Sequence, residues 1–371
     1  MKGRLFLLGW VIILSSMFFM AEAQNNQLSS NLYINAHNAM KPNIYTNIDS
    51  MLVYRKGNLI SENYYGKFTA KTTHRTHSTF KSINALITLI AIDQGILAID
   101  EKVMHLLSRF GKTTNNSDVR KQHIKVKDLL DMTSGLACDE APGSKGPNHE
   151  WGVDEGPEPL QYSMDIKMAT EPGTEWHYCS ANSFMLAATV SAALERAGRD
   201  DIFHFANKYL MKPLDIESKS YRFTTSQNGK LLNGQGNSHF LPEDLAKFGL
   251  LLLNKGVWKN KTIISEKAIT QIYESSRTIN WSFTDLIESQ SNIKTTYSNQ
   301  WYNTTFEIQE SKLKVLHSWG NGGQYIFVVP ALDAVVVFTG SNQGNFYKQK
   351  QPFDIMNKYV LPELMKANRK I

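Results

Sequence analysis

The segment Ser78-Thr79-Phe80-Lys81 stands at the beginning of a long amphipathic pattern. The pattern continues to Gln94 and stops at Gly95, as a helix commonly does. Because residues i and i+3 share a helix face, Ser78 and Lys81 are expected on the same side of the first turn. The apolar residues that carry the helical spacing are Ile83, Leu86, Ile87 and Ile90.

Segments with strand patterns lie on both sides of this predicted helix. Residues 51–54 and 59–65 flank the turn Lys56-Gly57-Asn58, and this arrangement predicts a hairpin. Three more strands are predicted towards the end of the chain, and the last two are joined by a turn-type linker. They cover residues 312–316, 324–329 and 334–339.

The stretch between the two groups of strands, about residues 81–294, reads mostly as helical pieces separated by loops rich in glycine and proline. A terminal amphipathic segment, residues 353–366, follows the last strand. This order predicts an α+β fold with a mostly antiparallel sheet built from both chain ends, about 45–80 and 295–371. Helices flank the sheet, and the helical region is inserted between its two parts.

The composition excludes several classes of protein. The chain has 371 residues, of which 42% are hydrophobic and 20% charged, so it can bury a large core. Its formal net charge of +6 is scattered along the sequence, and a nucleic-acid groove is not expected. Two cysteines exclude a disulfide scaffold, and no His/Cys cluster has zinc-ligand spacing. We therefore expect neither a metal nor a cofactor.

The first residues predict export. Lys2 and Arg4 precede the apolar run 5–20, and Ala21-Glu22-Ala23 has the small-x-small pattern of a signal-peptidase site. Residues 1–23 are predicted to be a signal peptide cleaved before Gln24, and an uncleaved N-terminal anchor is the alternative. The mature chain, residues 24–371, is then one periplasmic or secreted domain without stable insertion in a membrane.

A serine becomes a useful nucleophile when a base lies within hydrogen-bond reach, and Ser78-x-x-Lys81 on a helix meets this requirement. The spacing also occurs at Ser291-x-x-Lys294, in a polar stretch, and at Ser311-x-x-Lys314, in a predicted strand that separates the two side chains. Only Ser78 opens an amphipathic helix, whose N-terminal dipole and free N–H groups would act on its hydroxyl. The alternative for Ser78 is an ordinary N-cap serine.

A second proton carrier is predicted at Tyr178, which ends the segment 172–178 just before an apolar helix at 184–194. The ammonium of Lys81 would favour the phenolate if the two lie side by side. The alternative is a core tyrosine at the start of a helix. His177 is a neighbouring base candidate, although a histidine between aromatic residues is more often structural.

A third feature is the turn Asn321-Gly322-Gly323, which leads through Gln324 into a strand. Glycines at a strand's edge let a substrate carbonyl approach the backbone, and the next N–H can hold an oxyanion. An ordinary turn into a strand is the alternative.

Together these segments resemble the serine β-lactamase and penicillin-binding-protein superfamily, in particular its branch of class C β-lactamases, D-aminopeptidases, EstB-type esterases and 6-aminohexanoate-oligomer hydrolases. The resemblance covers about residues 45–345, and Met132-Thr133-Ser134-Gly135-Leu136 is its most specific phrase. The matching segments, in chain order, are residues 51–66, 78–81 with 93–95, 124–136, 171–173 with 178–180, 242–249 and 320–330.

The resemblance implies a role for each matching residue. Ser78 would be the acylated nucleophile, Lys81 its proton-relaying partner and Tyr178 the general base. The backbone N–H groups of Ser78 and Gln324 would form the oxyanion hole.

Two departures from the family pattern concern substrate binding. The family's Tyr-x-Asn is replaced by Tyr178-Cys179-Ser180, and Asn182 lies too late in the motif to take over. The family's Lys-Thr-Gly element is replaced by Asn321-Gly322-Gly323, which lacks the cation that attracts a substrate carboxylate. In this branch Ser180, Asn321, Gly322 and Gly323 would contact the substrate. Both departures favour a small esterase or amidase over a true β-lactamase.

The resemblance also places Cys138 and Cys179 in loops that line the same site, where either a disulfide or two buried free thiols would fit. The implied function is an exported serine hydrolase acting on a small ester, amide or peptide-like molecule through a Ser78 acyl-enzyme. A D-Ala-D-Ala-type carboxypeptidase or weak β-lactamase is one alternative, and a noncatalytic penicillin-binding-like protein is another. No nucleic-acid partner is expected, and no oligomeric state follows from the sequence.

Overall fold

The computed structural model of the chain describes residues 28–32, 34–35, 38, 44–140, 153, 156–226, 229–274, 277–279 and 294–369. The predicted signal peptide and its cleavage site lie outside these residues. None of the helices in the described part of the chain combines the length and apolar character that a membrane span needs.

Eight described strands form one sheet in the order β2-β1-β13-β12-β11-β10-β9-β8, and every neighbouring pair is antiparallel. The hairpin from the N-terminal part lies beside the last strand, so both chain ends build the sheet, as the sequence predicted. The strands are β1 (Ile48–Arg55), β2 (Asn58–Tyr64), β8 (Arg277–Thr278), β9 (Lys294–Ser298), β10 (Trp301–Ile308), β11 (Ser311–Gly320), β12 (Gln324–Val329) and β13 (Ala334–Gly340).

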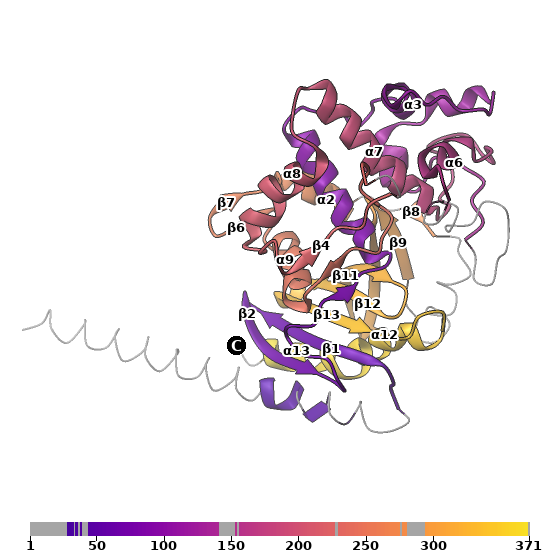
Figure 1. Cartoon of the computed structure of the whole chain (residues 1–371). Coiled ribbons are helices and arrows are strands. Elements are labelled where there is room, and N and C mark those ends of the chain that lie inside the picture. Colours follow the sequence, from indigo (N-terminus) through magenta and orange to yellow (C-terminus); the bar gives the residue numbers. More distant parts are fainter. Residues whose placement is uncertain are drawn as a thin grey trace, which may run out of the picture.

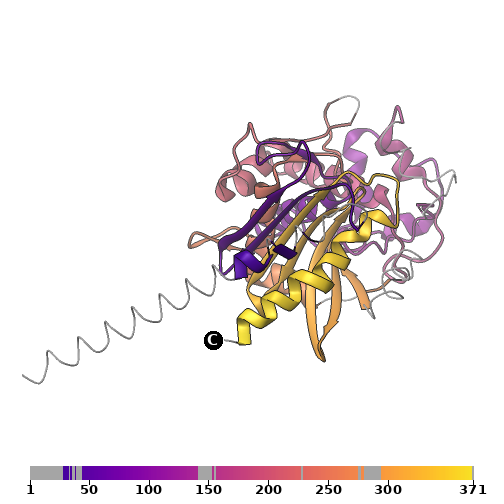
Figure 2. The same ribbon diagram turned by 90° about the horizontal axis from the view of Figure 1, so that it is seen from below.

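Helices cover both faces of this sheet (Figures 1 and 2). On one face, Gly249 of α9 (Pro242–Leu253) lies against Ile326 of β12. On the other face, Phe353 of α12 (Gln351–Ile355) packs on Tyr325, the residue before Ile326 in β12, at a ring distance of 5.3 Å. Since successive side chains of a strand point to opposite faces, β12 is buried on both sides, which explains its continuous apolar run.

The helical region lies between β2 and β8 in the chain, and its long helices α2 (Thr79–Asp93) and α7 (Ser180–Arg196) are buried over most of their length. Short strand pairs, β3 (His74–Arg75) with β5 (His239–Phe240) and β4 (Tyr221–Arg222), and β6 (Val257–Trp258) with β7 (Lys261–Thr262), connect its parts. The α-helices with defined bounds in the described residues are α2 (Thr79–Asp93), α3 (Val103–Leu107), α4 (Val126–Leu130), α6 (Pro159–Asp165), α7 (Ser180–Arg196), α8 (Ile202–Ala206), α9 (Pro242–Leu253), α10 (Glu266–Glu274), α12 (Gln351–Ile355) and α13 (Leu361–Arg369). The predicted α+β fold is confirmed.

Strands β9 and β10 were not predicted, because Thr, Tyr and Asn alternate there without an apolar run. The turn between them, Asn299-Gln300, inserts into the helical region. Gln300 accepts a hydrogen bond from Ser82 of α2 at its carbonyl and one from Ser183 of α7 at its side chain, and its amide donates to Leu129 of α4. Three helices are thereby tied to one edge of the sheet by buried hydrogen bonds.

Candidate active site

Ser78 and Lys81 are in contact at the beginning of α2. The Lys81 ammonium donates a hydrogen bond to Ser78 Oγ at 3.1 Å and another to the carbonyl of Gln235 at 2.8 Å. Ser78 makes no side-chain capping bond to the helix, which argues against the ordinary N-cap interpretation. The lysine is 2% exposed, so its charge is held in place by these acceptors rather than by bulk water.

Tyr178 lies on the other side of the same ammonium. Lys81 Nζ is 5.1 Å from the centre of the Tyr178 ring, and the ring is 9% exposed. Trp176 packs against it with a ring distance of 6.4 Å. The structure therefore brings together the hydroxyl of Ser78, the ammonium of Lys81 and the ring of Tyr178.

The backbone before the nucleophile is tightly constrained. His77 has a φ of +47°, in the left-handed region that residues with a side chain rarely adopt. A Cβ added to Gly236 would lie 2.9 Å from the carbonyl oxygen of His77, so only glycine fits there. Thr76 is held by Ser238, whose carbonyl accepts from its N–H at 2.8 Å and from its hydroxyl at 2.7 Å. Such strain persists only where the surroundings enforce it, and it is common at active sites.

Gln324 contacts the first turn of α2 through its main chain, since its carbonyl accepts a hydrogen bond from Thr79 Oγ1 at 2.9 Å. Its side chain turns away and bonds to the main chain of Gly340. Because Gln324 contacts α2 in this way, its backbone N–H can lie near the nucleophile. The role of this N–H in an oxyanion hole stays a prediction.

The glycine-rich turn 321–323 packs against the segment that follows β13. Asn321 accepts a hydrogen bond from the N–H of Gly344 at 3.0 Å, and the carbonyl of Gly322 accepts one from the N–H of Asn342 at 3.0 Å. These bonds anchor the turn to residues 342–344, and substrate contacts by Asn321, Gly322 and Gly323 stay a prediction.

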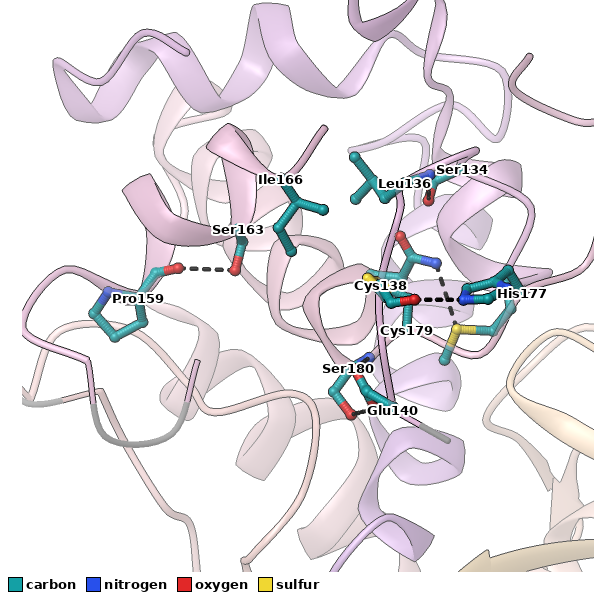
Figure 3. The surroundings of a disulfide bond; sticks show 12 residues. Ser134, Leu136, Cys138, Glu140, Pro159, Ser163, Ile166, His177, Cys179 and Ser180 are labelled. Carbon is teal, nitrogen blue, oxygen red and sulfur yellow. Dashed lines mark hydrogen bonds between the residues drawn. A yellow bond between two sulfur atoms is a disulfide. The ribbon is translucent and has the colours of Figure 1, made fainter. Parts of the chain in front are cut away.

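Cys138 and Cys179 form a disulfide with a Cα–Cα distance of 5.4 Å (Figure 3). His177 Nε2 lies 2.6 Å from the carbonyl oxygen of Cys138, so this ring is engaged by the backbone and not by Ser78. Ser180 donates its N–H and its hydroxyl to the carboxylate of Glu140, at 2.5 and 2.7 Å. The Ser180 hydroxyl, which stands where the family has an asparagine amide, is thus already hydrogen-bonded to Glu140.

Three residues beside the site were missed at the sequence level. The carbonyl of Gln235 accepts a hydrogen bond from Lys81, the carboxylate of Glu140 accepts from Ser180, and Tyr302 of β10 is buried. Burial raises the pKa of Tyr302 well above its usual value, and the neighbouring Tyr178 and Glu140 add to this shift, so Tyr302 stays a neutral phenol. In the sequence, the flanking Gly234 and Gly236 are a weak indication that Gln235 belongs to the site. No local pattern indicates Glu140 or Tyr302.

The arrangement suits acyl transfer. A phenolate beside an ammonium can take up the proton of a serine hydroxyl and return it later in the reaction. In this arrangement of described residues, Ser78, Lys81 and Tyr178 can carry out the proton transfers without a histidine.

Comparison with known proteins agrees with this geometry. A family model described as Beta-lactamase matches residues 49–355. The 6-aminohexanoate-dimer hydrolase of Paenarthrobacter ureafaciens is 24% identical over 298 residues, which are 78% of this chain and 71% of that protein.

Solved structures show the same fold. A family VIII carboxylesterase has a TM-score of 0.63 and 13% identity over 85% of this chain and 92% of its own. A class C β-lactamase mutant has a TM-score of 0.61 and 15% identity over 92% of this chain and 97% of its own. Because the family model covers most of the sequence, this chain belongs to the Beta-lactamase family of hydrolases, as its motifs predicted.

Proposed function

We propose that the protein is an exported serine hydrolase that cleaves a small ester or amide through an acyl-enzyme on Ser78. The observation that carries this proposal is the position of Lys81, which donates to Ser78 Oγ while its ammonium lies over the ring of Tyr178. The signal-peptide pattern in residues 1–23 is the support for export.

In the proposed mechanism, Ser78 Oγ attacks the substrate carbonyl and its proton passes to Tyr178, with Lys81 stabilising the phenolate. The N–H groups of Ser78 and Gln324 would hold the oxyanion of the tetrahedral intermediate. When the carbonyl re-forms, Tyr178 returns the proton to the leaving alcohol or amine. Water then attacks the ester carbonyl on Ser78 and gives a proton to Tyr178. When the bond between Ser78 Oγ and the acyl carbon breaks, Tyr178 returns this proton to Ser78 Oγ, and the acid is released.

The first test is covalent labelling. A fluorophosphonate is expected to add one equivalent to the wild-type protein, and peptide mapping by mass spectrometry should place the adduct on Ser78. Ser78→Ala is expected to take up no label and to lose hydrolysis of a short p-nitrophenyl ester. Absence of any adduct on the folded wild-type protein would instead support the noncatalytic binding protein.

The second test concerns the substrate class. The turn 321–323 carries no cation, and Ser180 directs its hydroxyl to Glu140, so two contacts that hold a β-lactam in the wider family are missing. Since a hydrogen bond to a charged group contributes about 1.5–3 kcal/mol, kcat/KM for a neutral p-nitrophenyl ester is expected to exceed that for a chromogenic cephalosporin by about 100-fold.

The same assay should include the dimer of 6-aminohexanoate as an amide, because a relative is named for that activity. It should also include a D-Ala-D-Ala peptide. Preferential turnover of the cephalosporin or of the D-Ala-D-Ala peptide would replace the esterase assignment by the weak β-lactamase or carboxypeptidase alternative.

A further inference from the structure

Two short segments, residues 138–140 and 177–180, lie side by side, and we call the contacts between them the seam (Figure 3). The second segment contains Tyr178, the proposed base. On one side of Tyr178, the ring of His177 bonds to the carbonyl of Cys138. On the other side, Cys179 is bonded to Cys138 through sulfur. The two residues that flank Tyr178 are thus held by the same cysteine residue.

Glu140 adds a second anchor directly after the disulfide. Its two carboxylate oxygens accept the N–H and the hydroxyl of Ser180, the first residue of α7. A carboxylate at this end of a helix is also favoured by the helix dipole. The carboxylate lies within 4.8 Å of both sulfur atoms. The disulfide holds Cys179 and Glu140 holds Ser180, so the two anchors act on adjacent residues of one short segment.

We propose that the seam is a positioning device for Tyr178, with Glu140 and the Cys138–Cys179 disulfide as its anchors. This inference rests on the proposed function, in which the phenol must stay beside the ammonium of Lys81. Tyr178 precedes α7 and lies outside any described helix or strand, so helix hydrogen bonds do not fix its position. A misplacement of about 1 Å at a reacting group lowers the rate by about 100-fold.

Because the two anchors hold adjacent residues, each is expected to compensate in part for loss of the other. Glu140→Ala, and the pair Cys138→Ala with Cys179→Ala, should each lower kcat for the p-nitrophenyl ester by about tenfold with KM unchanged. The combined variant should lose about 1000-fold, which is more than the product of the separate losses.

Glu140→Gln tests whether the hydrogen bonds or the charge matter. A glutamine can accept the N–H of Ser180 at its carbonyl oxygen and donate its amide to the Ser180 hydroxyl, so both bonds are kept. This variant is expected to retain wild-type kcat and an unchanged pH profile. A loss as large as that of Glu140→Ala would contradict positioning through these bonds.

Asp93 offers a matched control, because its carboxylate accepts the N–H and the hydroxyl of Ser265 at 2.6 and 2.7 Å just before α10. Asp93→Ala removes the same kind of helix-end contact elsewhere in the molecule. It should lower the midpoint of urea unfolding about as much as Glu140→Ala while kcat stays at the wild-type value.

Reduction of the wild-type protein is an independent test that needs no substitution. Dithiothreitol supplies two electrons and two protons, leaves as its cyclic disulfide, and converts Cys138 and Cys179 to thiols. We expect kcat to fall about tenfold, with retained circular dichroism, and to recover on reoxidation. Reduced protein with unchanged kcat, or a combined variant with wild-type kcat, would overturn the inference. If the wild-type protein takes up no fluorophosphonate, the proposed function itself fails; labelled protein with insensitive seam variants rejects the seam alone.

Discussion

Replacing Tyr178 by phenylalanine is expected to lower kcat toward a short p-nitrophenyl ester by about 1000-fold while the protein stays folded. The ring is kept, so its contacts with Trp176 and with the ammonium of Lys81 persist. Only the hydroxyl that would carry the proton is removed. Steady-state kinetics measure kcat. Urea unfolding followed by tryptophan fluorescence measures the stability of the fold.

Tyr325→Phe is the control for this experiment. Tyr325 is also buried, and its hydroxyl donates to the carbonyl of Gln349 at 3.0 Å, on the face of the sheet that α12 covers. Loss of this bond should reduce stability by about 1 kcal/mol and leave kcat unchanged. Near-normal turnover by Tyr178→Phe would remove Tyr178 from the mechanism and leave Lys81 as the base.

Replacing Gly236 by alanine is expected to lower kcat by about 100-fold and to destabilise the fold by about 2 kcal/mol. The added Cβ would meet the carbonyl carbon and oxygen of His77 at 3.0 and 2.9 Å and the nitrogen of Ser78 at 3.5 Å. Because these are backbone atoms, the clash can be relieved only by moving the peptide that carries the nucleophile.

Gly249→Ala separates the catalytic effect from the loss of stability. Its Cβ would meet Cγ1 of Val335 at 2.6 Å and Cγ2 of Ile326 at 2.9 Å, where α9 packs on the sheet. A similar loss of stability is expected, with unchanged kcat. Equal kcat values for Gly236→Ala and Gly249→Ala would show that the His77–Ser78 peptide tolerates displacement.

Much of the site could be predicted from short stretches of sequence. Ser78 and Lys81 contact each other because they are three residues apart at the start of a helix, and α2 ends at Asp93, close to the predicted boundary. The resemblance to a known family then selected Tyr178 among several tyrosines. Local patterns did not exclude Tyr297, because Tyr297-Ser298-Asn299 has the Tyr-x-Asn pattern more literally; the structure buries Tyr297 in β9.

The missed parts of the fold have a common physical cause. Strands β9 and β10 hold polar and aromatic residues in an order that carries no strong strand pattern, and their position at the sheet depends on pairing with β11. The turn at Gln300 is buried because three helices accept or donate hydrogen bonds there, which no local segment reveals.

By itself the sequence determined what depends on neighbouring residues: the helix at Ser78, the hairpin before it, the strands at the end of the chain and the pairing of a hydroxyl with an amine. Only the tertiary structure decided which distant groups complete the site, namely the phenol over Lys81, the carbonyl of Gln235 and the carboxylate of Glu140. The reason is that helix periodicity and turn preference act over a few residues, whereas contacts between distant loops depend on how the sheet and the helical region pack together.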